Sequence, residues 1–429
     1  MNTSAMKKEE QTLEHAMHAI GEAAREAYRE LANATSELKN KALLAAADSI
    51  EKNVQLILDA NAKDMAAAKE KGLTGPLLDR LLLDEKRIKA MAAGVRAVAK
   101  LPDPVGKMMT EWDRPNGLHI SRVSVPLGVI GIIYESRPNV TADAGALCIK
   151  SGNAAILRGG SESFHSSKAI VTCLHDGLKE AGLSKAAVQL VPTQDREAVG
   201  IMLKMVGLID VIVPRGGLSL TQRVAEESRI PTILHLDGNC HTYLHEKADL
   251  EKAVAITFNA KMRRTGICGA TESILVDKSV VDTIWPAVAK KLLDEGCEVR
   301  ADIRAKKADS RIKDASQQDW GTEYLDKIVS VKTVQDVTEA IQHINHYSSH
   351  HTDAIITEDS AAAEQFLKGV DSAIVLHNAS TQFADGGEFG LGAEIGISTG
   401  RLHARGPVGA DQLVTYKYVV HGNGQIRPV

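Results

Sequence analysis

The sequence is poor in aromatic residues, in net charge and in long apolar runs. Phe, Trp and Tyr make up 3% of the 429 residues, and the formal net charge at pH 7 is −4. Nucleic-acid-binding proteins depend on clustered cations and on aromatic rings that stack on bases, so no nucleic-acid partner is expected. No apolar run reaches the roughly 18 residues that span a membrane, and the N-terminus has no apolar signal segment. No membrane contact is expected either.

Paired cysteines are also missing. The five cysteines are widely spaced, their number is odd and no CxxC occurs. A disulfide framework or a zinc site is therefore not expected. A reducing, cytoplasmic compartment is expected instead. Histidines gather at His343, His346, His350 and His351, but no second ligand group has a suitable spacing. No metal is expected there.

The pattern of elements predicts an α/β protein, and the length allows two or three domains. Residues 12–100 read as helices, because Ala, Glu, Lys and Leu dominate and apolar side chains recur with a helical period. Residues 118–125 alternate between apolar and polar side chains after a Pro-Asn-Gly turn, which predicts a hairpin arm.

Two series of short apolar segments, separated by helical segments, predict two doubly wound, Rossmann-like parallel sheets. The first series covers 129–133, 154–157, 188–191 and 211–213. The second covers 232–234, 273–276, 328–331, 354–356 and 373–375. A last alternating segment, 412–420, is a candidate partner for the arm near Leu118.

Cys268 carries the clearest chemical signal. It stands on a Gly-flanked turn ahead of the apolar run 273–276, and the cations before it are Lys261, Arg263 and Arg264. Nearby cations lower the pKa of a thiol and increase the fraction of thiolate, the nucleophilic form. These features predict that Cys268 is a nucleophile that forms a thioester.

The other cysteines fit structural positions better. Cys148 and Cys173 stand among apolar residues and are expected to be buried. Acidic neighbours flank Cys297 and oppose thiolate formation. Cys240 is the rival nucleophile, because His241 follows it and a Cys-His pair activates thiols in other enzymes.

Glycine turns at the ends of predicted strands are candidates for cofactor binding, although the first sheet lacks the GxGxxG fingerprint. The segment RGGS at 158–161 carries Arg158 and Ser161, and a cation with a hydroxyl favours a ribose 2′-phosphate over a free 2′-hydroxyl. An ordinary turn is the alternative. Arg215, Gly216 and Gly217 form a second such turn after the segment 211–213.

Several long segments are specific in combination. They are VPLGVIGIIYESRPN at 125–139, GNAAILRGG at 152–160, the stretch around Cys268, and the segments 334–355 and 388–408. Together they resemble the gamma-glutamyl phosphate reductase family of the aldehyde dehydrogenase superfamily, over essentially the whole chain.

The resemblance implies NADPH-dependent reduction of L-glutamyl 5-phosphate to L-glutamate 5-semialdehyde with release of phosphate, the second step of proline biosynthesis. It implies an aldehyde dehydrogenase-like fold. Its expected parts are a cofactor-binding domain at 1–102 and 126–237, a catalytic domain at 238–400, and an oligomerisation arm and tail at 103–125 and 401–429. A homodimer or homotetramer is expected, and a glutamate 5-kinase is a candidate partner because it makes the labile substrate.

The resemblance also implies roles for single residues. Cys268 matches the nucleophile, and Glu323 matches the acid that holds the nicotinamide ribose. The turn with Arg158 and Ser161 falls where the superfamily contacts the adenosine ribose or its phosphate. The turn with Gly216 and Gly217 falls near the pyrophosphate.

One departure from the superfamily bears on the reaction. Hydrolytic members carry a Glu that activates the deacylating water, whereas the matching stretch here is LHLDGN at 234–239. Leu236 or His235 takes the position of that Glu, and Asp237 is close. An activated water would waste the acyl intermediate, so the absence favours an acyl phosphate substrate. The alternatives are a hydrolytic enzyme that oxidises a small amino-acid-derived aldehyde, and a catalytically silent assembly partner.

The oxyanion donor and the substrate contacts are expected on other loops. In ESRPN at 135–139, Asn139 is the candidate oxyanion donor and Ser136 is the alternative. The cations that could neutralise the leaving phosphate are Lys261, Arg263 and Arg264. The candidates for gripping the amino and carboxylate groups of the substrate are Ser398, Thr399, Arg401 and Arg405.

Overall fold

The computed structural model describes residues 3–427, and the chain divides into two compact units. Unit 1 takes the residues up to Ile233, together with Gly390–Gly396 and the residues from Val408 on. Unit 2 takes Leu234–Phe389 and Ile397–Pro407. The expected boundaries need correction at the C-terminal end. Residues 401–407 lie in unit 2, because β14 (Ile397–Ser398) pairs there with β15 (Gly406–Pro407).

Helices account for most of residues 3–100 of unit 1, as the sequence predicts. They are α1 (Thr3–Leu31), α2 (Ser36–Lys52), α3 (Val54–Glu70), α4 (Gly75–Leu81) and α5 (Glu85–Lys100). Side-chain caps at Thr35 and Asp84 accept backbone N–H groups and begin α2 and α5. Helix α7 (Phe164–Glu180) contacts α2 closely at Gly177, where a Cβ atom would lie 2.2 Å from the Ala42 carbonyl oxygen.

The sheet of unit 1 has four parallel strands in the order β5-β4-β3-β6, which confirms the first predicted series. The strands are β3 (Val129–Tyr134), β4 (Ala154–Gly159), β5 (Val188–Leu190) and β6 (Val211–Arg215). The remaining helices are α6 (Asn139–Lys150), α8 (Glu197–Met202) and α9 (Leu218–Glu227). Strand β3 is buried along its whole length, as its unbroken apolar run requires. The carboxyl ends of β4, β3 and β6 meet at one edge, which brings both predicted glycine turns together.

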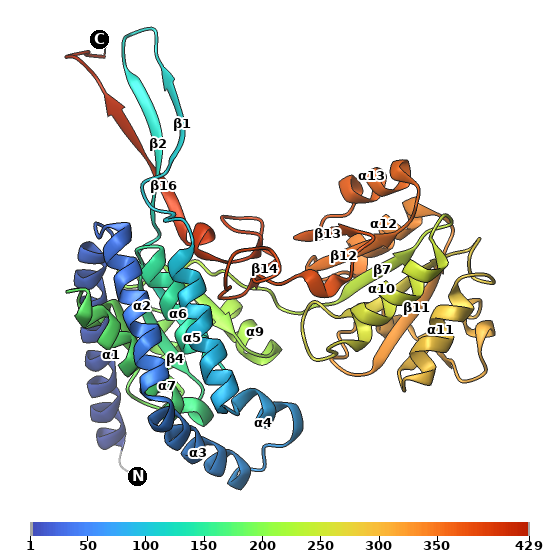
Figure 1. The fold of residues 1–429 in the computed structure, drawn as a ribbon, viewed down its shortest axis with the longest axis horizontal. Coiled ribbons are helices and arrows are strands. Elements are labelled where there is room, and N and C mark those ends of the chain that lie inside the picture. Colours follow the sequence, from blue (N-terminus) through green and yellow to red (C-terminus); the bar gives the residue numbers. More distant parts are fainter. Residues whose placement is uncertain (1–2, 428–429) are drawn as a thin grey trace. The chain divides into compact units, whose positions relative to one another are not determined.

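The predicted arm is a three-stranded antiparallel sheet that extends from the helices of unit 1 (Figure 1). Its strands are β1 (Met108–Asp113), β2 (His119–Pro126) and β16 (Val414–His421). Strand β16 pairs with β2 from Val414 opposite Pro126 to His421 opposite His119. The C-terminal segment therefore joins the arm, as its alternating pattern predicts.

The sheet of unit 2 has seven parallel strands in the order β10-β9-β11-β8-β7-β12-β13. They are β7 (Cys240–Leu244), β8 (Thr271–Asp277), β9 (Glu298–Ala301), β10 (Lys313–Asp314), β11 (Ile328–Val334), β12 (Thr352–Ile356) and β13 (Ile374–His377). The helices are α10 (Leu250–Met262), α11 (Trp285–Asp294), α12 (Val337–Tyr347) and α13 (Ser360–Gly369).

The expected strand at 232–234 is wrong. This segment makes only an isolated bridge from Thr232 to Ile212, and the first strand of unit 2 begins at Cys240. Strand β7 was missed because CHTYL carries polar side chains, although every residue in it is buried. The edge strands β9 and β10 were not expected.

Short 3-10 helices complete the fold at Ser161–Ser163, Lys185–Ala187, Ala305–Ala308, Gln317–Gly321, Thr381–Phe383 and Ala410–Leu413. Among the helices of residues 3–427, none combines the length and apolar character needed to cross a membrane.

Candidate functional site

The candidate site lies at the amino ends of four neighbouring parallel strands of unit 2. The order β11-β8-β7-β12 places these ends side by side. The segments that lead into them carry Glu323, Cys268, residues 235–238 and His351, respectively. Positions far apart in the sequence are thereby brought to one edge of the sheet.

Cys268 stands on the turn between α10 and β8, as predicted. The turn that precedes β7 packs against Cys268. A Cβ atom on Gly238 would lie 2.2 Å from the Cys268 carbonyl oxygen and 2.6 Å from its Cα. The Cys240 thiol donates a hydrogen bond of 3.1 Å to the same carbonyl oxygen. A glycine at 238 is therefore required for the Cys268 backbone to take this position.

Cys268 is partly exposed, whereas the other four cysteines are buried. The expected burial of Cys148 and Cys173 is confirmed. Burial raises the pKa of the Cys240 thiol well above its usual range, and it raises the pKa of Cys297 to about 12. The rival nucleophile Cys240 is therefore held as an unreactive thiol, since thiolate is the reactive form.

Two histidines flank the Cys268 sulfur. One ring nitrogen each of His235 and His351 and the Cys268 Sγ all lie within 4.8 Å of one another. Burial alone would raise the pKa of the Cys268 thiol, but His351 and His235 outweigh burial and hold the pKa well below its usual range. The arrangement supports a thiolate–imidazolium pair at the turn.

Both imidazoles are fixed by their other ring nitrogen. His235 Nδ1–H donates to the Ile397 carbonyl oxygen at 2.6 Å, and His351 Nδ1 lies 2.8 Å from Thr352 Oγ1. The two rings meet edge to face, with centroids 5.1 Å apart. The carbonyl oxygen therefore sets the tautomer of His235, whereas the Thr352 hydroxyl and the Cys240 sulfur, 3.7 Å from Nδ1, hold the ring of His351 in place.

Sequence reasoning did not connect these two histidines with Cys268. His351 was read within a histidine run, and the structure separates that run. His343 is buried beside Tyr347, His346 is exposed, and His350 Nδ1 donates to the Asp371 carbonyl oxygen at 2.6 Å. The available signal for His235 was its place in LHLDGN, where hydrolytic relatives carry Glu.

We expect the two histidines to control the pH range in which Cys268 is reactive. In the wild type the pKa of Cys268 is lowered, so iodoacetamide should alkylate it at nearly the maximal rate even at pH values well below the usual pKa of a thiol. In His235→Gln and in His351→Asn the pKa should rise, and each unit of rise lowers the thiolate fraction at lower pH about tenfold. Alkylation rates between about pH 5 and pH 9, read by mass spectrometry, test this. His346→Gln is the matched control, and a profile unchanged by both active-site substitutions would contradict the assignment.

Two carboxylates share the surroundings of Cys268. Burial raises the pKa of Glu323, and the negative charges of Cys268 and Asp237 raise it further. The Gly238 backbone N–H donates to Glu323 and opposes this rise. Burial likewise raises the pKa of Asp237. Glu323, expected to hold the nicotinamide ribose, thus lies within electrostatic range of the nucleophile.

Lys261 needs correction as a substrate contact. Its side chain is completely buried and forms an ion pair with Glu272 of β8, which is also completely buried. Glu272 Oε1 in addition accepts the Leu325 N–H at 3.3 Å. Glu272 therefore ties both the end of α10, through Lys261, and the loop that carries Glu323 to the strand after Cys268. Of the other cations before Cys268, Arg263 reaches Gln382 Oε1 at 3.3 Å, and Arg264 is exposed.

The candidates in the C-terminal loop of unit 2 are buried there or bonded to other segments of unit 2. Ser398 is buried in β14. Arg405 donates to Asp371 Oδ1 at 2.8 Å and to the Asp371 carbonyl oxygen at 3.1 Å, and Arg401 pairs with the same carboxylate. The Thr399 N–H donates to the Leu234 carbonyl oxygen at 3.3 Å. Asp371 therefore already neutralises much of the positive charge of Arg401 and Arg405, which a substrate carboxylate would need as its partner.

In unit 1, the predicted turn after β4 is held by backbone oxygens. Arg158 is buried and donates to the carbonyl oxygens of Gly159, Gln194 and Asp195, at 2.6, 3.0 and 3.2 Å. Burial lowers its pKa. Within the described residues its Nε has no hydrogen-bond partner. Ser161 is half-buried, and its hydroxyl donates to Glu162 Oε2 at 3.4 Å.

The loop after β3 distinguishes the two oxyanion candidates. Ser136 has a φ of 42°, a left-handed conformation that a non-glycine residue adopts only when its surroundings fix it. Its N–H and its hydroxyl both donate to Glu162 Oε1, each at 2.7 Å. Asn139 is exposed at the start of α6, and its amide donates to Asp143 at 3.0 Å. Ser136 has therefore already committed its donors, and Asn139 is the better candidate.

The second glycine turn holds an internal anion. Glu135 Oε2 accepts the Gly217 N–H at 3.0 Å, at the first turn of α9. A Cβ atom on Gly216 would lie 2.5 Å from the same oxygen. Arg215 ends β6, and its buried Nε lacks a partner in the part of the chain that the structure describes. The turn thus has the donors that a phosphate requires, with a carboxylate on one of them.

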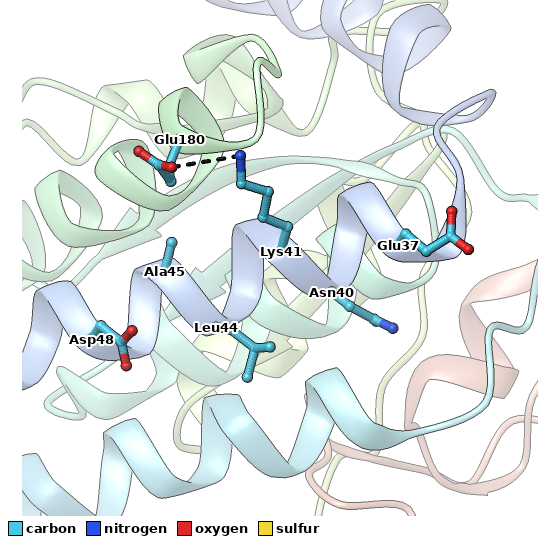
Figure 2. A pocket seen from close by; sticks show the side chains of 7 residues that line it. All are labelled: Glu37, Asn40, Lys41, Leu44, Ala45, Asp48 and Glu180. Atoms are coloured by element: carbon cyan, nitrogen blue, oxygen red, sulfur yellow. Dashed lines mark ion pairs between the residues drawn. The ribbon is translucent and has the colours of Figure 1, made fainter.

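A surface depression of about 500 Å³ lies elsewhere on unit 1 (Figure 2). Residues of α2 line it together with Glu180 of α7, and Lys41 pairs with Glu180 across it at 3.5 Å. The depression is open to solvent and is lined by charged and uncharged side chains, none of which belongs to either predicted turn.

Comparisons with known proteins agree with this geometry. The model of the aldehyde dehydrogenase family matches residues 2–296. The chain is 62% identical to the gamma-glutamyl phosphate reductase of Paramagnetospirillum magneticum, over 97% of this chain and 98% of that protein. It is 61% identical to the enzyme of the same name from Rhodospirillum rubrum, over 95% of this chain and 96% of that protein. The crystal structure of the gamma-glutamyl phosphate reductase of Thermotoga maritima superposes with a TM-score of 0.93 at 43% identity, covering 96% of this chain and 100% of that one.

Proposed function

The chain belongs to the gamma-glutamyl phosphate reductases of the aldehyde dehydrogenase family, and on that premise we propose that it reduces L-glutamyl 5-phosphate to L-glutamate 5-semialdehyde with NADPH and releases phosphate. This reaction is the second step of proline biosynthesis. The observation that carries the proposal is Cys268, the partly exposed cysteine, with two imidazoles at its sulfur and no Glu at the position of the hydrolytic base.

The first chemical step is acyl transfer to Cys268. The thiolate attacks the carbonyl carbon of the acyl phosphate, the S–C bond forms, and the bond from carbon to the phosphate oxygen breaks. The proton that an imidazole took from the thiol is available to the leaving phosphate. The backbone N–H of Cys268 and the amide of Asn139 are the proposed donors to the oxyanion, and one such donor typically contributes about 3–4 kcal/mol.

When bound, a reduced nicotinamide cofactor supplies the hydride that brings the thioester carbon to the aldehyde level. The C–S bond then breaks and Cys268 returns to the thiolate that its histidines stabilise. Glu323 is the proposed contact of the nicotinamide ribose. Where hydrolytic members carry the Glu that activates water, this chain has His235 or Leu236. The Nδ1–H of His235 donates to the Ile397 carbonyl oxygen. The absence of that Glu supports cleavage of the thioester by hydride or by phosphate rather than by water.

The family of the chain implies a nicotinamide cofactor, and we propose that it is NADPH. The proposed contacts are Arg158 and Ser161 for the 2′-phosphate, and Arg215, Gly216 and Gly217 for the pyrophosphate. The unpartnered buried Nε atoms of Arg158 and Arg215 support a ligand at these turns.

We expect the wild type to favour NADPH over NADH by about 10–100-fold in kcat/KM, the range of a charge-assisted hydrogen bond. Ser161→Glu should reverse this preference, because a carboxylate repels the 2′-phosphate and accepts a hydrogen bond from a free 2′-hydroxyl. Initial rates with both cofactors decide the matter, with Thr172→Glu on the exposed side of α7 as a control for added charge. Equal kcat/KM values in the wild type would contradict the cofactor assignment.

The reverse reaction tests the proposed function itself. Glutamate 5-semialdehyde, NADP⁺ and phosphate varied from zero should give NADPH only when phosphate is present, because phosphate must cleave the thioester. NADPH formed equally without phosphate would mean that water deacylates Cys268. The chain would then be a hydrolytic aldehyde dehydrogenase.

The remaining assignments are proposals about partners and place. The arm exposes apolar side chains at Met108, Met109, Trp112, Tyr416 and Tyr418. We propose that it joins copies of the chain into a homodimer or homotetramer, and that a glutamate 5-kinase supplies the substrate. Arg264, which is exposed and precedes Cys268 in the sequence, remains the candidate contact of the substrate phosphate. Ser398 and Arg405 remain the candidate contacts of the substrate amino and carboxylate groups. The free thiols support a cytoplasmic location.

A further inference from the structure

The three side chains at the nucleophile also have the composition of a zinc site. Each offers one ligand atom, and the three atoms all lie within 4.8 Å of one another. Zn²⁺ prefers thiolate and imidazole ligands, and sites with three protein ligands leave a fourth position open for water. The donors of a tetrahedral zinc lie roughly 3.3–3.8 Å apart, as bonds of about 2.0–2.3 Å require. The ligand atoms must therefore approach one another to bind zinc, and His235 and Cys268 are partly exposed, whereas His351 is buried.

The hydrogen bonds around both rings match those of metal-binding histidines. His235 Nδ1–H donates to the Ile397 carbonyl oxygen, which leaves Nε2 as the nitrogen that carries the lone pair. His351 Nδ1 contacts Thr352 Oγ1, and its Nε2 has no hydrogen-bond partner within residues 3–427 although the side chain is 0% exposed. Metal-binding histidines usually donate their other ring N–H to an oxygen of this kind. The unpartnered Nε2 is a separate indication that the space takes a ligand.

The charge around the site also suits a cation. Asp237 interacts electrostatically with both imidazoles, and Glu323 interacts with Cys268 and with Asp237. A thiolate with two nearby carboxylates gives the space a negative potential when the imidazoles are neutral. This potential attracts a divalent cation.

We propose that His235, Cys268 and His351 bind one Zn²⁺ through two Nε2 atoms and the Cys268 Sγ, with water at the fourth position. Zinc binding releases to solvent the proton that the imidazoles hold in the thiolate–imidazolium pair, and it forms no covalent bond to carbon. The metal-bound protein is inactive because the lone pair that attacks the substrate is shared with zinc. This last consequence rests on the proposed role of Cys268 as the nucleophile.

The test uses the full chain and reads binding directly. Co²⁺, added to protein freed of metal with a chelator, should give a thiolate-to-cobalt charge-transfer band at one equivalent, and Zn²⁺ should abolish it. The band should be absent in Cys268→Ser. In His235→Gln and His351→Asn the Kd for zinc should rise at least about 100-fold, since even the loss of a group that only supports a ligand costs 10–100-fold. His346→Gln, which removes an exposed histidine of α12, should bind as the wild type does.

Zinc should also slow alkylation of Cys268 by iodoacetamide and inhibit turnover, and a chelator should reverse both effects. Thermal unfolding shows which variants are folded. If substitution of the buried His351 by Asn prevents folding, the wild type is compared with His235→Gln alone. Absence of the cobalt band in the wild type, or equal zinc affinity in the wild type and His235→Gln, would overturn the proposal. Binding and alkylation need no substrate, so they stand or fall independently of the proposed reaction.

Discussion

Cys268→Ala is expected to lower kcat/KM by at least about 10⁴-fold, as removal of a covalent nucleophile does in other enzymes. The described residues offer no second activated thiol, because Cys240 is fully buried and its pKa lies well above the usual range. Cofactor binding should remain near the wild-type level, because the substitution removes none of the proposed cofactor contacts. The measurement combines initial rates in the reverse reaction with a fluorescence titration of NADPH.

Cys240→Ala is the informative partner of this variant. Its thiol contacts the Cys268 carbonyl oxygen at 3.1 Å and His351 Nδ1 at 3.7 Å, so a moderate loss of activity is expected when the turn and the imidazole are held less well. Substantial activity in Cys268→Ala together with complete loss in Cys240→Ala would move the nucleophile to Cys240. Cys173→Ala, on α7 of unit 1, controls for the loss of a buried thiol that lies away from the site.

Lys261→Met is expected to lower the free energy of unfolding by about 3–5 kcal/mol. The substitution removes one partner of a completely buried ion pair and leaves Glu272 in an apolar environment. Burial already raises the pKa of Glu272 with Lys261 present, and without the cation it should rise further. Urea unfolding followed by circular dichroism measures the loss.

The pH dependence of this variant separates a buried charge from a simple packing defect. Between the unfolded-state pKa and the raised folded-state pKa, the folded protein binds more protons than the unfolded chain, so stability falls as pH rises. The cost of Lys261→Met should therefore be larger at about pH 8 than at about pH 6. In the double variant with Glu272→Gln most of the loss should be recovered.

Lys290→Met breaks an exposed pair with Asp294 and should change stability by less than about 1 kcal/mol. A loss of stability independent of pH would contradict the account.

The sequence predicted those features that are written in short local patterns. The apolar runs of β3 and β4 and the helical period before residue 100 required no tertiary information, and the alternation of 412–420 was enough to find the partner of the arm. Cys268 was found because glycine, cations and a following strand are all neighbours in the sequence.

The features that the sequence did not reveal depend on burial and on neighbours distant in the chain. Lys261 was predicted, with Arg263 and Arg264, to contact the substrate because it is one of the cations before Cys268, but only the fold shows that it faces Glu272. His235 and His351 meet at Cys268 because β7, β8 and β12 are adjacent strands, and their spacing in the sequence carries no sign of this. Strand β7 was missed because polar residues such as His241 and Thr242 are satisfied inside the protein, where His241 pairs with Asp353 at 3.0 Å.

Glu135 gives the second glycine turn a tethered competitor. If that turn takes the phosphates of the cofactor, each binding event must displace a carboxylate that is held at high effective concentration by its own backbone. The free energy of that displacement is subtracted from the affinity for the cofactor. Each departing cofactor is replaced at once by a group already in place, so the Gly217 N–H is not left without an acceptor. An oxidoreductase must release its oxidised cofactor in every cycle. A carboxylate that takes the place of the cofactor phosphates favours this release.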